Sequence, residues 1–158
     1  MRSPKSAAVL SKKSFGTAVE LYVASCLVGM GLDVYAPLVD DRGVDLLIRR
    51  ADGSTDEIQV KAVSDGRWFQ VARRDLPTSA EHARHWVLGV EGDLTTWVFP
   101  ARVFFDDRIA SKSRSSTGRH VFDLNLDLTR RGNAKPNVKL LGKYRDAWDL
   151  LMWQPRPD

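Results

Sequence analysis

The chain has 158 residues, a formal net charge of +4 and a hydrophobic fraction of 43%. This length predicts a single domain, and the apolar share excludes a disordered chain. No stretch approaches the ~18 consecutive apolar residues of a membrane span, and the N-terminus lacks the apolar core of a secretion signal. The single cysteine, Cys26, excludes an internal disulfide and a four-cysteine zinc site. We therefore expect a cytoplasmic protein without a membrane partner.

The first half of the chain predicts one helix followed by three strands. Apolar residues recur at spacings of three and four over residues 14–31, which predicts a helix packed on a core, with Ser14 as its N-cap. Alternation and turn residues then predict strands at 32–38, 44–49 and 57–63.

The second half predicts further strands and a terminal helix around the same single sheet. An amphipathic helix is expected over residues 143–152, with Tyr144, Ala147, Trp148, Leu151 and Met152 on one face. Its other expected elements are strands at 68–73, 85–90, 95–100 and 120–126, a helical turn at 101–105, and a loop with a helical turn at 75–84. The domain is expected to span residues 14–154, behind a basic tail of residues 1–13.

Basic residues gather in segments that contain no acid. Residues 1–13 are one such segment. Residues 108–119 are another; Ser-rich and without apolar periodicity, the stretch 108–120 is expected to be a flexible basic loop. Lysine and arginine clusters neutralise phosphates, which favours a polyanionic partner. The alternative is a solvated tail and loop that only aid solubility.

Polar side chains that could carry chemistry alternate along the third predicted strand. Glu57, Gln59 and Lys61 would share one face, spaced about 6.6 Å apart. Asp45 in the preceding strand is costly to bury unpaired, and pairing of the two strands would bring it near Gln59 and Lys61. Glu20, on the first helix, could reach the same edge.

Such a group suits phosphodiester hydrolysis. Mg²⁺ prefers oxygen ligands and binds one or two carboxylates together with a substrate phosphate, and a neighbouring lysine can orient or deprotonate the attacking water. The alternative is that this row is the solvated face of a hairpin, with Asp45 paired to Arg42 or Arg49.

The segments FGTAVE, GVDLLI and EIQVKAVS resemble the signature of the PD-(D/E)xK nuclease superfamily. The similarity covers residues 14–64, and the chain is particularly similar to small members such as Holliday-junction resolvases and intron homing endonucleases with a Gln-x-Lys motif. It implies a restriction-endonuclease-like α/β core, in which helices flank a mixed sheet in the order α-β-β-β-α-β.

The resemblance also implies residue roles. Asp45 becomes the central metal ligand, Lys61 the catalytic lysine and Glu20 a supporting acid that contacts the metal through water. Gln59 stands where most members have an acid, and Glu57 on the same face is a substitute. The implied metal is Mg²⁺, with Mn²⁺ able to replace it, and its implied ligands are Asp45, Gln59, Val60 and Glu20.

Together these features predict a metal-dependent DNA endonuclease. Cutting both strands takes two sites, so a homodimer or higher symmetric oligomer is expected. The candidate phosphate contacts are Lys12, Lys13, Arg67, Arg73, Arg74, Lys112 and Arg114. The first alternative is a nuclease-like DNA-binding module that lost cleavage because Gln59 weakens the metal site. The second is an unrelated basic α/β interaction domain.

Overall fold

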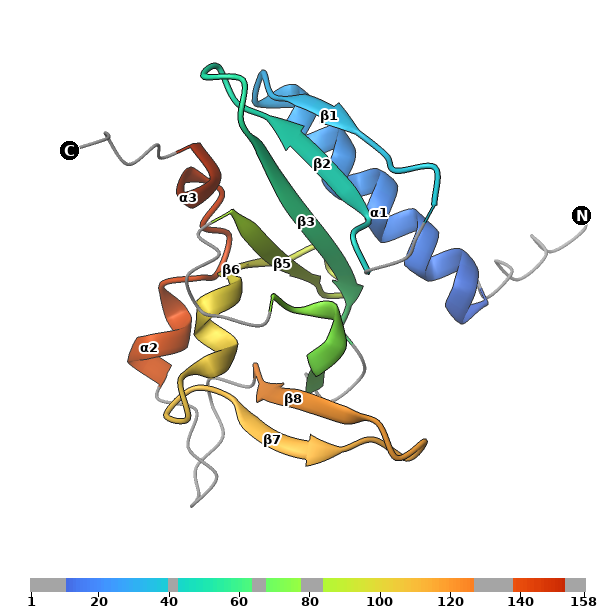
Figure 1. Cartoon of the computed structure of the whole chain (residues 1–158), viewed down its shortest axis with the longest axis vertical. Helices are drawn as coiled ribbons and strands as arrows, with labels where there is room; N and C mark the ends of the chain where they lie inside the picture. The colour runs from blue at the N-terminus through green and yellow to red at the C-terminus, as the bar shows by residue number, and fades with distance from the viewer. Residues whose placement is uncertain (1–10, 40–42, 64–67, 78–83, 127–137, 153–158) are drawn as a thin grey trace, which may run out of the picture.

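The structure is a computed structural model that describes residues 11–39, 43–63, 68–77, 84–126 and 138–152. Figure 1 shows a long helix on one side of a sheet and a small second sheet below it. In chain order the elements are α1 Lys12–Gly29, β1 Asp33–Tyr35, β2 Leu46–Arg49, β3 Thr55–Ala62, β4 Trp68–Ala72, η1 Arg73–Asp75, β5 His85–Val90, β6 Thr96–Pro100, η2 Ala101–Phe105, β7 Ser111–Arg114, β8 His120–Asn125, α2 Val138–Gly142 and α3 Asp149–Met152.

The larger sheet is mixed and has the strand order β1-β2-β3-β5-β6. Only the β3–β5 pair is parallel, and the other neighbours are antiparallel. The turn between β2 and β3 forms because Asp52 accepts a hydrogen bond from the Ser54 N–H (2.8 Å) and Gly53 takes a φ of 82°. This hairpin holds β2 and β3 in the register that positions the candidate site.

The larger sheet is covered on both faces. Val19, Val23 and Leu27 of α1 pack on one face, against alternate residues of β2 and β3 such as Ile48 and Ile58. The other face packs against the smaller sheet, whose strand order is β4-β8-β7. Two apolar cores therefore share the larger sheet. The expectation of a single sheet is wrong, because β4, β7 and β8 pair among themselves and form a second sheet.

The expected mixed sheet flanked by helices is confirmed. The first helix begins at Lys12 and not at residue 14, because Ser11 is the N-cap and its Oγ accepts from the Ser14 N–H (3.1 Å). The expected tail of residues 1–13 therefore ends inside the helix. Between β3 and β5, where the implied order has a helix, the described residues form β4 and η1; residues 78–83 lie outside them.

Two sequence-based expectations in the second half are corrected. The expected helix over 143–152 is helical only at Asp149–Met152, because the preceding residues are tied to β6. Asp146 has a φ of 49°, donates from its N–H to the Thr96 carbonyl (2.6 Å) and accepts from the Thr96 N–H (2.8 Å). The expected loop at 108–120 contains β7, which pairs with β8 although all its side chains are exposed.

None of the helices in the described residues is long and apolar enough to cross a membrane.

Candidate functional site

Pairing of β2 with β3 brings Asp45 alongside Gln59. Leu46 is opposite Ile58 in the register, so the residue before Leu46 lies beside the residue after Ile58. The Asp45 N–H donates to the Ile58 carbonyl (2.9 Å), and Asp45 Oδ2 accepts from the Val60 N–H (2.6 Å). At the end of the β2–β3 ladder the carboxylate therefore takes the place of a main-chain acceptor for the Val60 N–H. Asp45 is held on β3 by this hydrogen bond and by the one from its own main chain.

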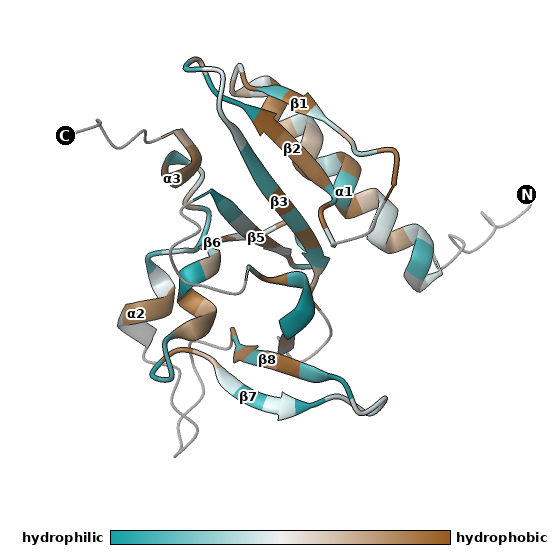
Figure 2. Ribbon diagram, viewed as in Figure 1, coloured by the Kyte–Doolittle hydropathy of each residue, from teal (hydrophilic) through white to brown (hydrophobic). Residues whose placement is uncertain are grey.

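The predicted polar face of β3 is present in the structure. Glu57, Gln59 and Lys61 are opposite His85, Val87 and Gly89 of β5, and alternating hydrophilic and hydrophobic residues along β3 are visible in Figure 2. Ile58 and Val60 are buried on the α1 side, so the polar row faces the smaller sheet. Gln59 is fully buried and Lys61 is half-buried, whereas Glu57 is exposed, so only the Glu57 end of this row is solvated.

The Gln59 side chain is held beneath Gly43 and beside Asp75. Its Nε2 donates to Asp75 Oδ2 (3.4 Å), whereas its Oε1 is buried and has no hydrogen-bond partner among the described residues. Gly43 has a φ of 67°, and a Cβ at that position would lie 2.6 Å from Gln59 Nε2. A buried acceptor without a hydrogen bond costs about 1–3 kcal/mol of folding free energy. The unpartnered Gln59 oxygen therefore lowers the stability of the fold.

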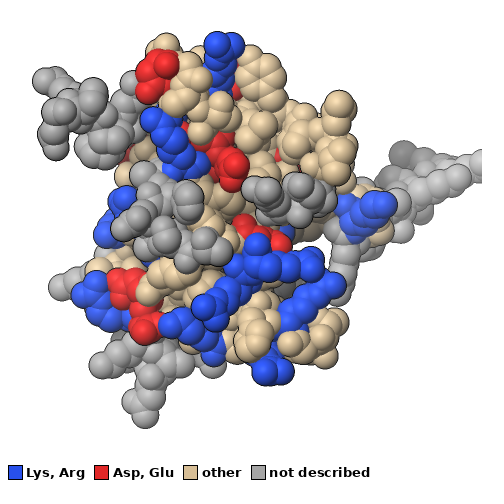
Figure 3. All heavy atoms as spheres, viewed as in Figure 1, with Lys and Arg blue, Asp and Glu red and all other residues tan. Residues whose placement is uncertain are grey.

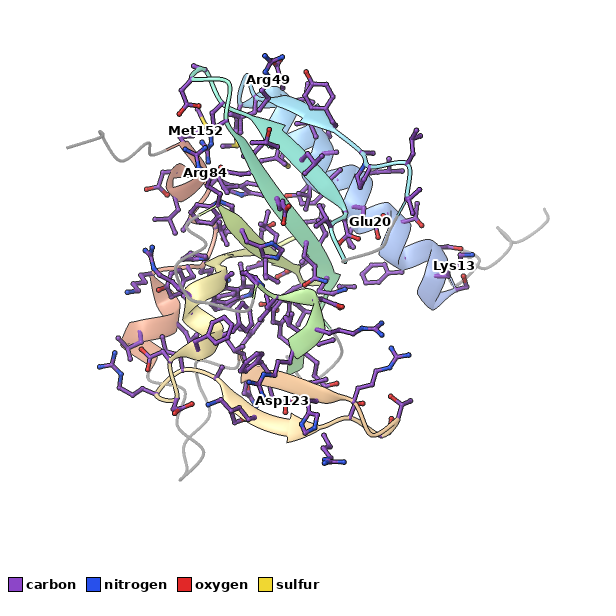
Figure 4. All side chains as sticks on the ribbon, viewed as in Figure 1. Lys13, Glu20, Arg49, Arg84, Asp123 and Met152 are labelled. Carbon is purple, nitrogen blue, oxygen red and sulfur yellow. The ribbon has the colours of Figure 1, made fainter. Side chains whose placement is uncertain are left out.

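The two glutamates predicted near the site differ in placement. Figure 4 shows Glu20 on α1 near the end of β2 that Asp45 precedes, although α1 covers the opposite face of the sheet. Glu57 is half-exposed, and its Oε2 lies 3.1 Å from His85 Nδ1. Glu57 is opposite Leu47 of β2, two residues before Gln59 on β3, and its carboxylate contacts a histidine. Its predicted role as a substitute acid stays a prediction.

The donor set of this site fits a hard divalent cation. Asp45 supplies a carboxylate and Gln59 a buried amide oxygen without a partner in the described chain, and oxygen donors of both kinds bind Mg²⁺. No group of three His, Cys, Asp or Glu residues suited to a metal occurs within the described residues, so a site rich in carboxylates or imidazoles is not formed there. The predicted ligand roles of Glu20 and Val60 stay predictions.

A basic surface lies below the site. Figure 3 shows Lys and Arg side chains gathered over η1 and the β7–β8 hairpin. Arg73, Arg74, Lys112 and Arg114 of the candidate contacts are exposed there. Lys112 already pairs with Asp107 (2.8 Å), whereas Arg114 forms no ion pair within the described part of the chain.

The other candidate contacts lie elsewhere. Lys13 is exposed in the first turn of α1, and Lys12 begins that helix with a side chain outside the described set. Arg67 lies outside the described residues altogether.

Sequence reasoning missed Asp75 and His85. Asp75 sits in a three-residue 3₁₀ turn with no periodicity, and its one local signal is that it is a single acid directly after two arginines. His85 is 5% exposed and begins a strand that is otherwise apolar or glycine. A lone histidine in such a strand carries no motif, so only the β3–β5 register reveals its contact with Glu57.

No protein-family model matches the chain, and no curated protein matches it either. Its fold is similar to that of a bacterial homing endonuclease, I-Ssp6803I, with 22% identity, a TM-score of 0.57, and coverage of 90% of this chain and 94% of that chain. A Holliday junction resolvase from Archaeoglobus fulgidus, Hjc, is 13% identical with a TM-score of 0.49, covering 72% of this chain and 85% of that chain. The likeness to the homing endonuclease is one of fold, and it confirms the expected mixed α/β fold.

Proposed function

We propose that this chain is a metal-dependent DNA endonuclease whose site consists of Asp45, Gln59 and Lys61, with Glu20 in support. The observation that carries the proposal is the buried amide oxygen of Gln59. This oxygen has no hydrogen-bond partner among the described residues. Gln59 is opposite Asp45, whose carboxylate is held by the Val60 N–H, and it lies two residues before Lys61 on the same face of β3. A fold similar to that of a homing endonuclease adds support.

Asp45 and Gln59 would hold Mg²⁺ or Mn²⁺ between them, with Val60 and Glu20 as the further predicted ligands. A bound divalent cation supplies Lewis-acid polarisation of the scissile phosphate and lowers the pKa of coordinated water. Lys61 is half-buried on the same face, and its ammonium group would stabilise negative charge that develops on the phosphate oxygens. Asp45 keeps its orientation through the Val60 N–H, so the carboxylate is preorganised before substrate arrives.

DNA would contact the basic surface below the site. Exposed Arg73 and Arg74 on η1 and Arg114 on β7 provide cations for phosphate contacts. η1 also carries Asp75, which contacts Gln59, so the phosphate contacts and the site share one element. A duplex bound there would therefore lie beside η1, the element that contacts Gln59.

The second candidate function is a DNA-binding module that no longer cleaves. It is favoured by Gln59 in place of an acid and by the lack, in the described residues, of a three-member cluster of His, Cys, Asp or Glu. An amide oxygen carries no net charge, so it binds a cation more weakly than a carboxylate does. This alternative predicts salt-dependent DNA binding with no metal-dependent products.

A symmetric dimer would supply the two sites that double-strand cleavage needs. Support comes from exposed apolar side chains on α1, where Leu21 and Val28 are 67% and 60% exposed and lie seven residues apart on one side of the helix. Light scattering on wild type and on Leu21→Glu tests this. A dimer that the substitution converts to monomer is the expected result, and a monomeric wild type contradicts it.

The experiment for the endonuclease incubates purified protein with supercoiled plasmid and with a four-way junction, in Mg²⁺, Mn²⁺ or EDTA. Lys61→Ala and Asp45→Asn are run beside wild type. Asn at position 45 still accepts from the Val60 N–H, so this variant removes charge while it keeps the anchoring bond. Lys143→Ala is the matched control for Lys61→Ala. Lys143 is exposed, and its Nζ lies over the Tyr144 ring, 5.0 Å from the ring centroid.

We expect cleavage in Mg²⁺ and Mn²⁺ but not in EDTA, with a loss of roughly 100-fold or more in each site variant. Lys143→Ala should cut like wild type. Binding without cutting in either metal would establish the inactive module. Normal cutting by both site variants would show that the site assignment is wrong.

A further inference from the structure

Three separate segments meet around the side chain of Gln59. Gln59 is fully buried on β3, and the Asp75 side chain on η1 is 16% exposed. Their contact joins Nε2 to Oδ2 over 3.4 Å. Gly43 closes over both, because a Cβ there would lie 2.6 Å from Gln59 Nε2 and 3.0 Å from the Cβ and Cγ of Asp75. The carboxamide therefore sits in a tight, built environment.

Asp75 sets the orientation of the Gln59 carboxamide, with the NH₂ group toward Asp75 and the oxygen away from it. An ionised carboxylate accepts hydrogen bonds and donates none, so it favours the amide NH₂ and repels the amide oxygen. Asp75 Oδ1 is engaged by Arg74 Nε (3.3 Å), and Oδ2 is the atom that Gln59 contacts. A 180° flip of the amide would set Oε1 against that carboxylate. Oε1 is thus directed away from Asp75, and it has no partner among the described residues.

We infer that Asp75 is a positioning residue that presents the Gln59 oxygen to the divalent cation of the proposed endonuclease. The inference rests on that proposed function and extends it to a residue on another element. Asp75 also supplies a negative charge beside a ligand at position 59 that has none of its own. Gln59 and Asp75 together carry the single negative charge that an acid at position 59 would carry alone.

The test is a charge exchange across the contact. Asp75→Asn keeps the shape but no longer favours one amide orientation. Gln59→Glu places one carboxylate against another. The double variant Gln59→Glu/Asp75→Asn restores a donor facing an acceptor and keeps one charge. Asp107→Asn, at an aspartate whose side chain is 77% exposed, is the matched control for charge.

Three quantities are measured on each protein: Mn²⁺ affinity without DNA, from the electron paramagnetic resonance of free Mn²⁺; the Mg²⁺ concentration for half-maximal plasmid cleavage; and the thermal unfolding midpoint. Removing a group that orients a metal ligand typically costs 10–100-fold in metal affinity. We expect Asp75→Asn to lose about 10-fold or more in Mn²⁺ affinity, with a matching rise in the Mg²⁺ requirement. Gln59→Glu should lower the unfolding midpoint of the metal-free protein, because two carboxylates then meet at a buried position. The double variant should return to within about 3-fold of wild type, and Asp107→Asn should not change.

Failure of the inference is distinguishable from failure of the proposed function. If wild type cuts DNA while Asp75→Asn keeps wild-type metal affinity, or lowers only the unfolding midpoint, the positioning role is wrong. A double variant whose Mn²⁺ affinity is no better than that of Asp75→Asn also overturns it. If wild type binds Mn²⁺ without cutting, the endonuclease proposal fails and the variants' affinities still decide the inference. If wild type neither binds Mn²⁺ nor cuts, both fail.

Discussion

Replacing Gly43 with alanine tests the packing above the candidate site directly. A left-handed backbone costs an L-residue with a Cβ about 1–2 kcal/mol, and Gly43 has a φ of 67°. Its new Cβ would also lie 2.6 Å from Gln59 Nε2 and 3.0 Å from Asp75, and overpacking of this kind costs about 1–3 kcal/mol. The two terms together predict that Gly43→Ala lowers the free energy of unfolding by about 2–5 kcal/mol.

The chain offers a matched control in Gly53, which has a φ of 82° and nothing within 4 Å of an added Cβ. Gly53→Ala therefore carries the backbone cost alone, about 1–2 kcal/mol. Urea unfolding followed by tryptophan fluorescence measures both variants, and heating should separate them by roughly 2–12 °C, at about 2–4 °C per kcal/mol for a chain of this size. Equal losses in the two variants would refute the close approach of Gly43 to Gln59 and Asp75.

Three further predictions concern stability and DNA binding. Asp56→Ala should destabilise the fold by about 3–5 kcal/mol in urea unfolding, because it leaves the buried guanidinium of Arg50 without its carboxylate partner. Arg114→Ala should reduce the slope of log affinity against log salt for duplex DNA by about 0.9, since one phosphate contact is lost. Hydrogen bonds from the Arg108 side chain and main chain lower the pKa of Asp106 from 3.8 to about 2. The stability that this group contributes is therefore present above pH 3.8 and is lost as the pH falls through 2, so Asp106→Asn should lower the unfolding midpoint at pH 7 and not below pH 2.

Each of these predictions has its own control. Asp107→Ala removes an exposed ion pair and should cost about 0–1 kcal/mol, so a loss as small for Asp56→Ala would contradict the buried pair. Arg102→Ala, at an exposed arginine of η2, should leave the salt slope unchanged. A difference between wild type and Asp106→Asn that does not vary with pH would contradict the assigned pKa.

Elements with strong local signals were predictable from the sequence. Residues 85–90 and 96–100 form strands because their apolar runs are buried on both faces of the sheet, and α1 follows its spacing of three and four. The spacing of Asp45, Gln59 and Lys61 was equally local, because one hairpin brings them together.

The remaining features depend on contacts far apart in the chain. β7 has only exposed polar side chains, and its strand exists because its main chain pairs with β8. The helix expected over 143–152 is interrupted because Asp146 bonds to Thr96, 50 residues away. Asp75 escaped notice since its contact with Gln59 requires β4 and η1 to fold back over β3.

The parallel β3–β5 pair has a consequence for the order in which the chain is made. Such a pair needs a long crossover, and here that crossover carries β4 and η1. β4 is held by β8, which leaves the ribosome some 50 residues later, as the pairing of Phe69 with Leu124 illustrates. A nascent chain that has reached β6 therefore already contains Asp45, Gln59 and Lys61 but lacks the strand that anchors the segment bearing Asp75. We expect the contact between Gln59 and Asp75 to form only when β8 has been synthesised, so the arrangement proposed for the metal site would be assembled late in translation.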